Sequence, residues 1–462
     1  MSQGPVAVAV IDIGKTNVKL ALVDPVSLNE IAVVTRPNDV LTGPPWPHFD
    51  VEGHWDFFLE NLAAFQTSHG VAAVSVATHG ASVVLIDQDG GLAAPILDYE
   101  HDGPEDLASA YDRIRPPFAE TGSPRLALGL NVGAQLHWQL NAMAGLRERV
   151  ALVLTYPQYW GYRLTGVAAS DVTSLGCHTD LWNPFRREPS GLLEQLGLGG
   201  RLAPPRTPGE SLGPLLPEIA QATGLPAHTP VLCGIHDSNA SLLPHLLTQS
   251  PPFSVISTGT WVIAMAIGGQ HRPLAPERDT LVNVNAFGDP VPSARFMGGR
   301  EYDLLMQGRE IAPDPRAIAA VAHGGQMLLP AVVPETGPFP GRRARWIAGE
   351  LPVGTAERTV AVGFYLALMS AECLDLIGHR GPIHVEGPFA CNASYLRMLA
   401  SATGCDVYGM PGMTGTSQGA ALLGQTTHPA GPELAPAITP DKGLAHYAET
   451  WRGLVGSGAR PA

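Results

Sequence analysis

Positive charge is scarce in this sequence. Its 462 residues include 28 lysines and arginines against 42 aspartates and glutamates, which gives a net charge of −14. DNA, RNA and anionic membrane surfaces are bound through basic faces, so the composition argues against a nucleic-acid-binding or membrane-binding protein. Only three of the basic residues are lysines, and two of them, Lys15 and Lys19, stand close together near the start of the chain.

Cysteine is also sparse. Its five positions are irregularly spaced and include no C-x-x-C pair: Cys177, Cys233, Cys373, Cys391 and Cys405. Disulfide frameworks and zinc or iron–sulfur sites draw on even numbers of cysteines or on closely spaced pairs. We therefore expect reduced thiols in a cytoplasmic protein that has no zinc or iron–sulfur site.

Long apolar runs are missing as well. No window of 18 residues is both apolar and free of charge, and the first residues lack a basic stretch followed by a long apolar core. We expect neither a transmembrane helix nor a signal peptide. With 45% hydrophobic and 15% charged residues the chain is typical of globular proteins, and its length predicts two or three domains.

The first half of the chain alternates between strand-like and helix-like segments, which is typical of an α/β protein. Residues 7–24 predict two strands around a tight turn, and residues 71–90 predict a strand, a loop and another strand. Residues 130–150 have the apolar spacing of a helix, and residues 156–166 predict a helix that ends at a glycine.

The second half begins with a similar unit. Residues 253–269 again predict two apolar strands around a short polar turn, and residues 358–379 predict a long helix. A strand over residues 381–387 and a last helix over residues 415–424 follow, and the Pro-rich segment beyond His428 predicts a surface wrap or a partly disordered tail. Two similar halves joined near residues 230–250 would enclose a ligand cleft, although any α/β protein contains several such hairpins.

The turn of the first hairpin, DIGKTN, is rich in groups that bind phosphate. Gly14 allows the backbone to approach a ligand, and successive N–H groups in such a turn form an anion nest. The turn region adds side-chain donors and positive charge from Lys15, Thr16, Asn17 and Lys19. The Asp12 carboxylate would repel a polyphosphate unless a divalent cation such as Mg²⁺ lies between the carboxylate and the phosphate. An ordinary hairpin turn, in which Asp12 bonds its own backbone, explains the same residues.

A second carboxylate follows an apolar strand in the segment GIHDSN. Asp237 stands where the strand gives way to a helix, so it fits either an N-cap or a general base at the carboxyl end of a strand. The neighbouring His236 fits either a satisfied loop histidine or a ligand to a sugar hydroxyl.

Two further loops could contact a nucleotide. In STGT, Gly259 is surrounded by hydroxyls and Thr260 follows it, which suits a second phosphate cradle or an ordinary Ser/Thr turn. In EGPFACN, Gly387 ends a strand and Asn392 begins a helix. A flat adenine ring could lie against that backbone, and a plain strand–helix loop capped by Asn392 is the alternative.

In this order, the motifs resemble the FGGY family of carbohydrate kinases, and the resemblance extends over residues 6–425. DIGKTNVK is similar to the family's first phosphate motif, and ISTGTW is similar to the second. GIHDSNASLL stands where the family has its catalytic aspartate. Residues 130–176 and 386–424 are similar to the family's middle segment and to its adenosine-binding end.

The resemblance implies an α/β fold of two actin-like/hexokinase-like (ribonuclease H-like) domains that close on ATP, Mg²⁺ and a sugar. Residues 1–238 would form the N-terminal domain with the sugar and phosphate side, and residues 239–430 the C-terminal domain with the nucleotide side. Residues 431–462 would form a tail. The partners would be a sugar and ATP, and a homodimer is compatible with the family.

The resemblance also implies residue roles. Asp237 would be the catalytic base that takes the proton from the attacking hydroxyl, and Asp12 would hold the hydration shell of Mg²⁺. The expected ATP and phosphate ligands are Gly14, Lys15, Thr16, Asn17, Lys19, Gly259, Thr260, Gly387 and Asn392. The expected sugar ligands are His79, Asp98, His236 and Asp237.

The chain departs from the family pattern at several positions. Lys15 replaces the usual Thr or Ser, and a lysine there would bind the γ-phosphate as a point charge. Pro388 and Phe389 replace glycines of the adenosine loop, Gln135 stands where a lysine is common, and His79 takes the place of a glutamine that touches sugar. The segment ILDYEHDG, residues 96–103, replaces the usual W-x-D-x-R.

Two motifs indicate the sugar. HDS and the SxGTW pattern are similar to the rhamnulokinase and fuculokinase branches, so we expect phosphorylation on O1 of a 6-deoxy-ketohexose such as L-rhamnulose or L-fuculose. The alternatives are a pentulose kinase of the xylulose or ribulose type, a catalytically inactive sugar-binding relative, and a different reaction on this fold, such as that of a phosphatase or an acyl-group kinase.

Overall fold

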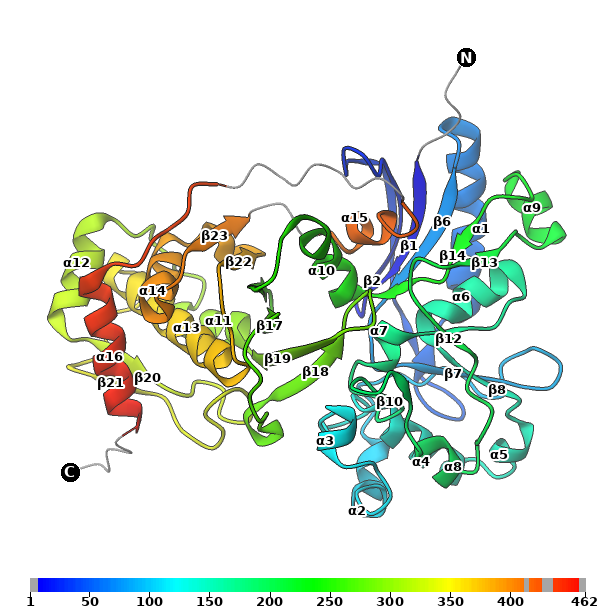
Figure 1. Cartoon of the computed structure of the whole chain (residues 1–462), viewed down its shortest axis with the longest axis horizontal. Coiled ribbons are helices and arrows are strands. Elements are labelled where there is room, and N and C mark those ends of the chain that lie inside the picture. The colour runs from blue at the N-terminus through cyan, green and yellow to red at the C-terminus, as the bar shows by residue number, and fades with distance from the viewer. Residues whose placement is uncertain (1–6, 411–414, 426–434, 457–462) are drawn as a thin grey trace. The chain divides into compact units, whose positions relative to one another are not determined.

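The computed structural model describes residues 7–410, 415–425 and 435–456 of the chain. These residues form two compact units. The first unit contains residues 7–248, 282–290 and 415–425, and the second contains residues 249–281, 291–410 and 435–456. Figure 1 labels the elements of both.

The first unit is built on a mixed sheet led by the predicted hairpin. Strands β1 and β2 pair antiparallel around the turn, β2 pairs antiparallel with β3, and β6 runs parallel to β1 on its other side. A short strand, β15 (Ile235–His236), also pairs with β6. In spatial order the remaining strands are β13 (Ser211–Gly213), β14 (Val231–Leu232), β6 (Ala73–Thr78), β1 (Val8–Ile13), β2 (Asn17–Val23) and β3 (Glu30–Pro37).

Helices surround this sheet, and several begin or end at the expected signals. Asn131 caps the helix that follows it by accepting the N–H of Ala134 at 3.1 Å, and Gly166 ends the next helix in a left-handed conformation. The longer helices are α1 (Val51–Ser68), α4 (Val132–Ala142), α6 (Tyr156–Thr165), α9 (Pro217–Thr223), α10 (Asp237–Thr248) and α15 (Thr416–Ala421).

Short elements complete the first unit. They are β4 (Val40–Leu41) with β5 (His48–Phe49), β7 (Val83–Ile86) with β8 (Leu152–Thr155), β9 (Ser170–Asp171) with β12 (Pro205–Arg206), β10 (Trp182–Asn183) with β11 (Glu188–Pro189), η1 (Gly103–Leu107), α2 (Ala108–Tyr111), α3 (Phe118–Thr121), α5 (Leu146–Arg149), α7 (Val172–Leu175) and α8 (Leu192–Gln195).

The second hairpin leads the other large sheet. Strand β16 pairs antiparallel with β17 and parallel with β22, and β22 pairs parallel with β23. In spatial order the strands are β18 (Thr280–Val284), β19 (Pro290–Phe296), β17 (Val262–Ile267), β16 (Phe253–Thr258), β22 (Ile383–Glu386) and β23 (Val407–Met410).

The two sheets share one topology. In each, a hairpin and a third antiparallel strand form one side, and two parallel strands continue from the first strand of the hairpin. The prediction of two similar α/β halves is therefore confirmed. In both halves the polar hairpin turn follows the central strand, β1 or β16, at its carboxyl end.

The helices of the second unit pack around a long central helix, α13. They are α11 (Gly298–Met306), α12 (Pro315–Gly324), α13 (Ala356–Leu376), α14 (Ala393–Thr403) and α16 (Lys442–Gly456), with η2 (Pro276–Arg278), η3 (Pro388–Cys391) and the strand pair β20 (Met327–Leu329) and β21 (Arg345–Ile347). Helix α13 is long and apolar enough to cross a membrane, but 83% of its apolar window is buried inside the fold, as in a core helix.

The C-terminal segment differs from its prediction as a surface tail. Helix α16 buries Leu444, Tyr447, Trp451 and Val455 in the core of the second unit, and Trp451 Nε1 donates a hydrogen bond to the carbonyl of Leu328 at 2.8 Å. These residues recur every three or four positions, which is the pattern of an amphipathic helix. The prolines of the surrounding segment led to the prediction of a tail in place of this helix. Residues 411–414, 426–434 and 457–462 of the predicted adenosine-binding end and tail lie outside the described residues.

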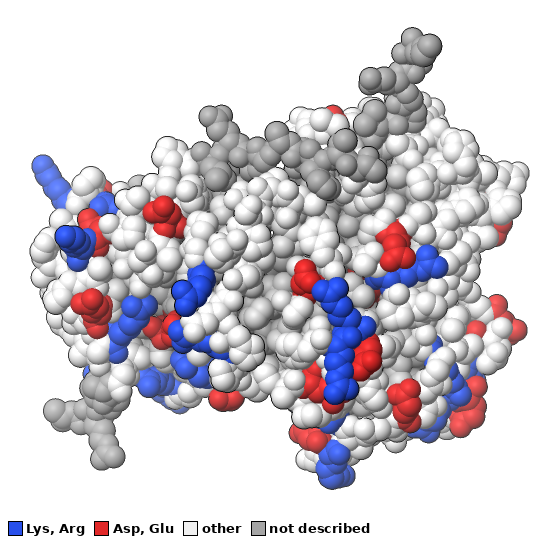
Figure 2. Space-filling model, viewed as in Figure 1, with Lys and Arg blue, Asp and Glu red and all other residues white. Residues whose placement is uncertain are grey.

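The compact units also divide the chain differently from the predicted domains 1–238 and 239–430. All of α10 belongs to the first unit, and so do residues 282–290 and 415–425. Helix α15 brings Ser417 against Asp12 of β1 within that unit. On the face that Figure 2 shows, the described basic side chains are interspersed with acidic ones and form no extended basic area.

Candidate functional site

The first hairpin turn has its backbone fixed from one side. The N–H of Gly14 donates to the carbonyl of Asn17 at 2.9 Å, and Asn38 Nδ2 donates to the carbonyl of Gly14 at 2.8 Å. Beside the turn lies an open pocket of about 540 Å³. Its lining is Asp12, Gly14, Lys15, Thr16, Asn17, Lys19 and Thr35, so the structure gathers every residue predicted for the phosphate and metal side of this turn.

Asp12 and Lys19 face each other across the hairpin. Lys19 Nζ lies 3.2 Å from Asp12 Oδ2 and 3.2 Å from Glu30 Oε1, and Ser417 Oγ donates to Asp12 Oδ2 at 3.0 Å. Burial raises the pKa of Asp12, and the ammonium of Lys19 opposes that effect. Both contacts end on Oδ2, and in the described part of the chain no hydrogen bond ends on Oδ1.

This arrangement fits a magnesium ion that is shared with phosphate. Among the described residues, no group of three or more histidines, cysteines, aspartates and glutamates could enclose a metal. Mg²⁺ is commonly bound by one or two carboxylates, with phosphate oxygens and waters as its other ligands. Asp12, whose Oδ1 accepts no hydrogen bond from any described residue, is a suitable single carboxylate beside the polar turn.

Lys15 extends toward the loop at residues 96–103. Its ammonium forms an ion pair with Asp98 and lies 3.3 Å from Glu100 Oε2. The same group stands over two aromatic rings, 4.9 Å from the centre of Tyr99 and 5.5 Å from the centre of Phe49. The structure therefore places Lys15 beside a predicted sugar ligand, although it also lines the pocket of the phosphate turn.

His79 follows β6 and is buried among aromatic rings. Its Nδ1 bonds the carbonyl of Gly80 at 2.8 Å, and its ring lies 5.1 Å from that of Tyr99 and 5.2 Å from that of Phe49. Burial lowers the pKa of His79 to about 4, so the imidazole is neutral near pH 7. Because Nδ1 must then carry the proton, Nε2 is an acceptor, and among the described residues it has no partner.

Asp237 begins α10, beside His236. Its Oδ1 accepts the N–H of Ser238 at 2.6 Å and lies 3.2 Å from His236 Nε2. The side chain is 31% exposed, so a substrate hydroxyl can reach it. Strand β15 pairs parallel with β6, and β6 pairs parallel with β1, so Asp237, His79 and Asp12 lie at the carboxyl ends of three adjacent strands.

The loop that presents Asp237 is held from beneath. The N–H of His236 donates to Thr173 Oγ1 at 3.0 Å, and Thr173 Oγ1 in turn donates to the buried Asp171 at 2.7 Å. Gly80 lies so close that a Cβ there would stand 2.8 Å from His236 Nε2. Residues 170–175 belong to a segment that resembles the family, but the sequence did not predict the contact between Thr173 and His236. These two residues are some 60 positions apart in the chain.

Cys177 is a site residue that the sequence did not single out. Its Sγ lies 3.6 Å from His236 Nε2 in the interior of the first unit. Burial works to raise the pKa of the Cys177 thiol, but the neighbouring His178 and His236 outweigh it and hold the pKa at about 5. Burial likewise works to lower the pKa of His236, but Cys177 and Asp237 raise it to about 9. The two pKa shifts have opposite directions because each group favours the charged form of the other.

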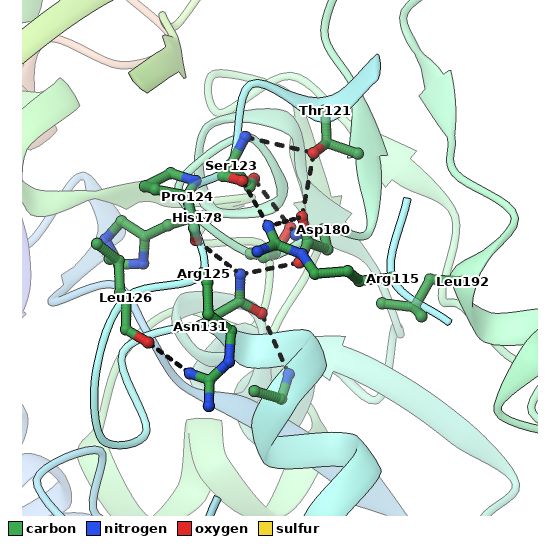
Figure 3. A network of polar contacts seen from close by, with 12 residues as sticks. Arg115, Thr121, Ser123, Pro124, Arg125, Leu126, Asn131, His178, Asp180 and Leu192 are labelled. Atoms are coloured by element: carbon green, nitrogen blue, oxygen red, sulfur yellow. Dashed lines mark hydrogen bonds and ion pairs between the residues drawn. The ribbon is translucent and has the colours of Figure 1, made fainter. Parts of the chain in front are cut away.

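A buried polar network fixes the segment that carries Cys177. Asp180 accepts hydrogen bonds from Arg115 Nη2 at 3.0 Å, Tyr111 Oη at 2.7 Å and Asn131 Nδ2 at 2.9 Å. Figure 3 shows Asp180 between Arg115, Asn131 and Thr121, and Thr121 Oγ1 is a further donor to Asp180 at 3.1 Å. His178 and Asp180, which follow Cys177 in the chain, have φ angles of 43° and 60°. The network therefore holds a strained backbone directly after Cys177.

Replacing Asp180 by alanine is expected to destabilise the first unit by about 3–5 kcal/mol, because it leaves Arg115 without its buried counter-charge. Replacing Asp289 by alanine is a matched control: its ion pair with Arg187 is exposed on both sides, so the loss should stay under about 1 kcal/mol. Thermal denaturation measures both. Equal melting temperatures for the two variants would contradict a structural role for the Asp180 network.

The second unit contains the other predicted turn and a pocket of about 420 Å³. The turn is closed by the Gly259 N–H, which donates to the carbonyl of Trp261 at 2.9 Å. The pocket is lined by Gly259, Thr260, Gly299, Tyr302, Asp303, Glu310, Pro388, Phe389, Cys391 and Asn392. The structure thus brings Gly259, Thr260 and Asn392 together, and it adds Tyr302, Asp303 and Glu310, which the sequence had not indicated.

Gly387 directly precedes the pocket residues Pro388 and Phe389 but is not itself among the lining residues. Its φ is +76°, and a Cβ there would stand 2.0 Å from the carbonyl oxygen of Thr258, so only glycine fits. Thr258 Oγ1 accepts the N–H of Phe389 at 3.1 Å, which fixes the loop that replaces the family's glycines. Asn392 caps α14 by accepting the N–H of Tyr395 at 3.1 Å, which agrees with the predicted alternative of a strand–helix loop capped by this residue. Asn392 also lines the pocket.

Gln135, which stands where a lysine is common, is a structural residue here. It is buried in α4, and its Nε2 donates to the carbonyls of Ala81 and Gly129. These bonds fix the loop after His79 against the segment that precedes α4.

Comparison with known proteins agrees with this geometry. Residues 7–244 match the N-terminal domain of the FGGY family of carbohydrate kinases, and residues 250–432 match the C-terminal domain of carbohydrate kinase FGGY. An L-fuculokinase of Salmonella typhi is 27% identical over 271 residues, which are 57% of this chain and 57% of that protein. The similarity thus spans little more than half the length of that relative.

Solved structures cover nearly the whole chain. A carbohydrate kinase from Novosphingobium aromaticivorans is 38% identical, with a TM-score of 0.90 over 97% of this chain and 100% of that one. A xylulose kinase from Lactobacillus acidophilus has a TM-score of 0.79 at 16% identity, over 98% of this chain and 97% of that one. At that identity the likeness concerns the fold, and it agrees with the predicted two-domain α/β class.

Proposed function

The chain belongs to the FGGY family of carbohydrate kinases, and on that premise we propose that it transfers the γ-phosphate of ATP to a hydroxyl of a ketose. The observation that carries this proposal is the position of Asp237. It stands partly exposed at the start of α10, and it follows β15 at the same edge of the sheet where Asp12 lies near the end of β1 and His79 follows β6.

In the proposed reaction, Asp237 accepts the proton of the attacking sugar hydroxyl. The oxygen forms a bond to the γ-phosphorus, the bond from that phosphorus to the β,γ-bridging oxygen breaks, and ADP leaves. Phosphoryl transfer depends chiefly on positioning and on neutralising charge. The N–H groups of the β1–β2 turn and the Lys19 ammonium would supply donors and positive charge to the phosphate.

Asp12 would hold the magnesium ion that accompanies ATP, through the oxygen that has no partner in the described structure. When bound, Mg²⁺ neutralises part of the phosphate charge. Lys19 keeps the Asp12 carboxylate in place, and Ser417 donates to its other oxygen.

The second unit would bind the nucleotide. Gly259 and Thr260 would meet the phosphates that stay with ADP, and the loop at Gly387 with Asn392 would face adenosine. Asp303 and Glu310 line the same pocket and offer carboxylate acceptors to the ribose hydroxyls.

We propose a 6-deoxy-ketohexose, phosphorylated on O1, as the sugar. The HDS and SxGTW motifs and the similarity to an L-fuculokinase support this class. The likeness to a xylulose kinase keeps a pentulose as the second candidate. An inactive sugar-binding relative is disfavoured because both carboxylates, Asp12 and Asp237, are present. A cytoplasmic location and a homodimer remain part of the same proposal.

A substrate panel tests the sugar. Purified protein with Mg²⁺ and ATP should release ADP in the presence of L-fuculose or L-rhamnulose, with kcat/KM about tenfold or more above that for D-xylulose and D-ribulose. Thermal shifts with each ketose give an independent ranking of binding. Higher kcat/KM for a pentulose would overturn the 6-deoxy-ketohexose assignment, and ketose-independent ADP release would overturn the kinase assignment.

A further inference from the structure

Lys15 of the first hairpin turn and Lys19 of the following strand β2 lie in two different environments. Lys19 lies between Asp12 and Glu30, at 3.2 Å from each, and therefore stays with the metal-side carboxylate. Lys15 pairs with Asp98 and approaches Glu100 at 3.3 Å, and both partners belong to the loop that follows residue 96. The two neighbouring lysines thus pair with two different groups of carboxylates.

The position of Lys15 is enforced by burial and charge. The side chain of Asp98 is 10% exposed, so its charge depends on the Lys15 ammonium as its close counter-ion. The rings of Tyr99 and Phe49 lie 4.9 Å and 5.5 Å from the same nitrogen and favour a cation between them. Moving Lys15 to a phosphate would leave Asp98 without its counter-ion, with the N–H of Glu100 as its remaining donor at 3.2 Å.

The Lys15 ammonium has donor capacity to spare. It carries three N–H groups, of which one is donated to Asp98, while Glu100 lies beside it as an ion-pair partner. The side chain is 23% exposed, and it lines the open pocket beside the turn. A further donor is therefore available to an oxygen atom of a ligand.

A complementary acceptor lies among the same rings. His79 Nε2 has no partner among the described residues, and the charges of both Lys15 and Asp237 act on this imidazole. Tyr99 contacts His79 and also stands beneath Lys15. A donor, an acceptor and apolar ring surface are thus grouped near the proposed base, as recognition of a polyol with an apolar face requires.

We propose that Lys15 is a sugar-specificity residue: its ammonium, held by Asp98 and Glu100, donates a hydrogen bond to an oxygen of the sugar and leaves the transferred phosphate to Lys19. This inference rests on the proposed kinase function. Because two carboxylates bracket one ammonium, the site favours a neutral ketose over a sugar acid, whose carboxylate would meet uncompensated negative charge.

Steady-state kinetics of Lys15→Met and Lys19→Met variants test this assignment. We expect Lys15→Met to raise the KM for the ketose about tenfold to a hundredfold, which is the usual effect of losing a hydrogen bond to a charged group, and to change the KM for ATP less than twofold. Lys19→Met is the matched change in the neighbouring strand β2. It should raise the KM for ATP and leave the KM for the ketose nearly unchanged. D-gluconate should be phosphorylated more slowly than the neutral ketose by wild-type protein.

Two further variants guard against a folding defect. Lys15→Arg keeps the counter-ion of Asp98, and Lys15→Met combined with Asp98→Asn removes both charges together. Both should unfold at temperatures close to wild type, and the double variant, which has no donor at position 15, should still show the raised ketose KM. If the double variant had a raised KM for ATP and an unchanged KM for the ketose, the assignment of Lys15 would be wrong. Phosphorylation of D-gluconate by wild-type protein faster than that of the ketose would have the same consequence. Either result would leave the kinase function standing. Absence of ketose-dependent ADP release in wild-type protein would instead overturn the proposed function, and with it this inference.

Discussion

Replacing Asp237 by asparagine is expected to lower kcat for ketose phosphorylation by about 10²–10⁴-fold, the usual contribution of a positioned general base. Asparagine has the same size and can still occupy the start of α10, but it cannot take the proton of the attacking hydroxyl. ATP binding should persist, because Asp237 is not among the residues that line either of the two pockets predicted to hold ATP. Kinetics and nucleotide titration on the purified variant measure the two effects separately.

A change at another helix start provides the control for this variant. Asp314 caps α12 by accepting the N–H of Ala317 at 2.7 Å, and asparagine is an equally good cap. Asp314→Asn should therefore retain wild-type kcat. Near-normal turnover by Asp237→Asn would remove Asp237 from the role of base. Loss of both activity and melting temperature in Asp237→Asn would assign it a mainly structural role.

Replacing Asp12 by asparagine is expected to reduce kcat by about 10²–10³-fold, as removal of one preorganised electrostatic contact does. It should also raise the Mg²⁺ concentration needed for half-maximal activity, because an amide oxygen carries no charge to hold the cation. The fold should tolerate the change, since Lys19 keeps Glu30 as a partner at 3.2 Å. Activity as a function of Mg²⁺ at saturating ATP is the appropriate measurement.

Glu30 supplies the control for Asp12. Glu30→Gln removes the other carboxylate next to Lys19, but Glu30 is not among the residues that line the pocket of the turn. Its Mg²⁺ dependence should match that of the wild type. The same Mg²⁺ dependence in Asp12→Asn and wild-type protein would show that Asp12 does not hold the metal.

Much of the fold could be read from local patterns. The two hairpins follow from apolar runs around short polar turns, and the helix at residues 156–165 ends at Gly166 because glycine adopts the left-handed conformation there. These signals depend on neighbouring residues only. Helix α16 was not predicted, because the prolines around it indicated an irregular tail. Its apolar residues nevertheless have the spacing of a helix.

The site was predictable only where it coincides with such local motifs. Asp12, Gly14, Thr16 and Asn17 belong to one turn, so their grouping follows from the sequence. The ion pair between Lys15 and Asp98 joins residues 83 positions apart, and Cys177 meets His236 across 59 positions. Contacts of that kind depend on the tertiary fold, and for this reason the environment of Lys15 differs from the one its motif suggested.

The central claim is that this chain moves a phosphate from ATP to a ketose. The most direct measurement is ³¹P NMR of a mixture of purified protein, Mg²⁺, ATP and L-fuculose or L-rhamnulose. The predicted result is a sugar phosphomonoester resonance that grows in proportion to ADP and that Asp237→Asn protein does not produce. Formation of inorganic phosphate in place of the sugar ester, or an unchanged ATP spectrum with every ketose tested, would contradict the claim.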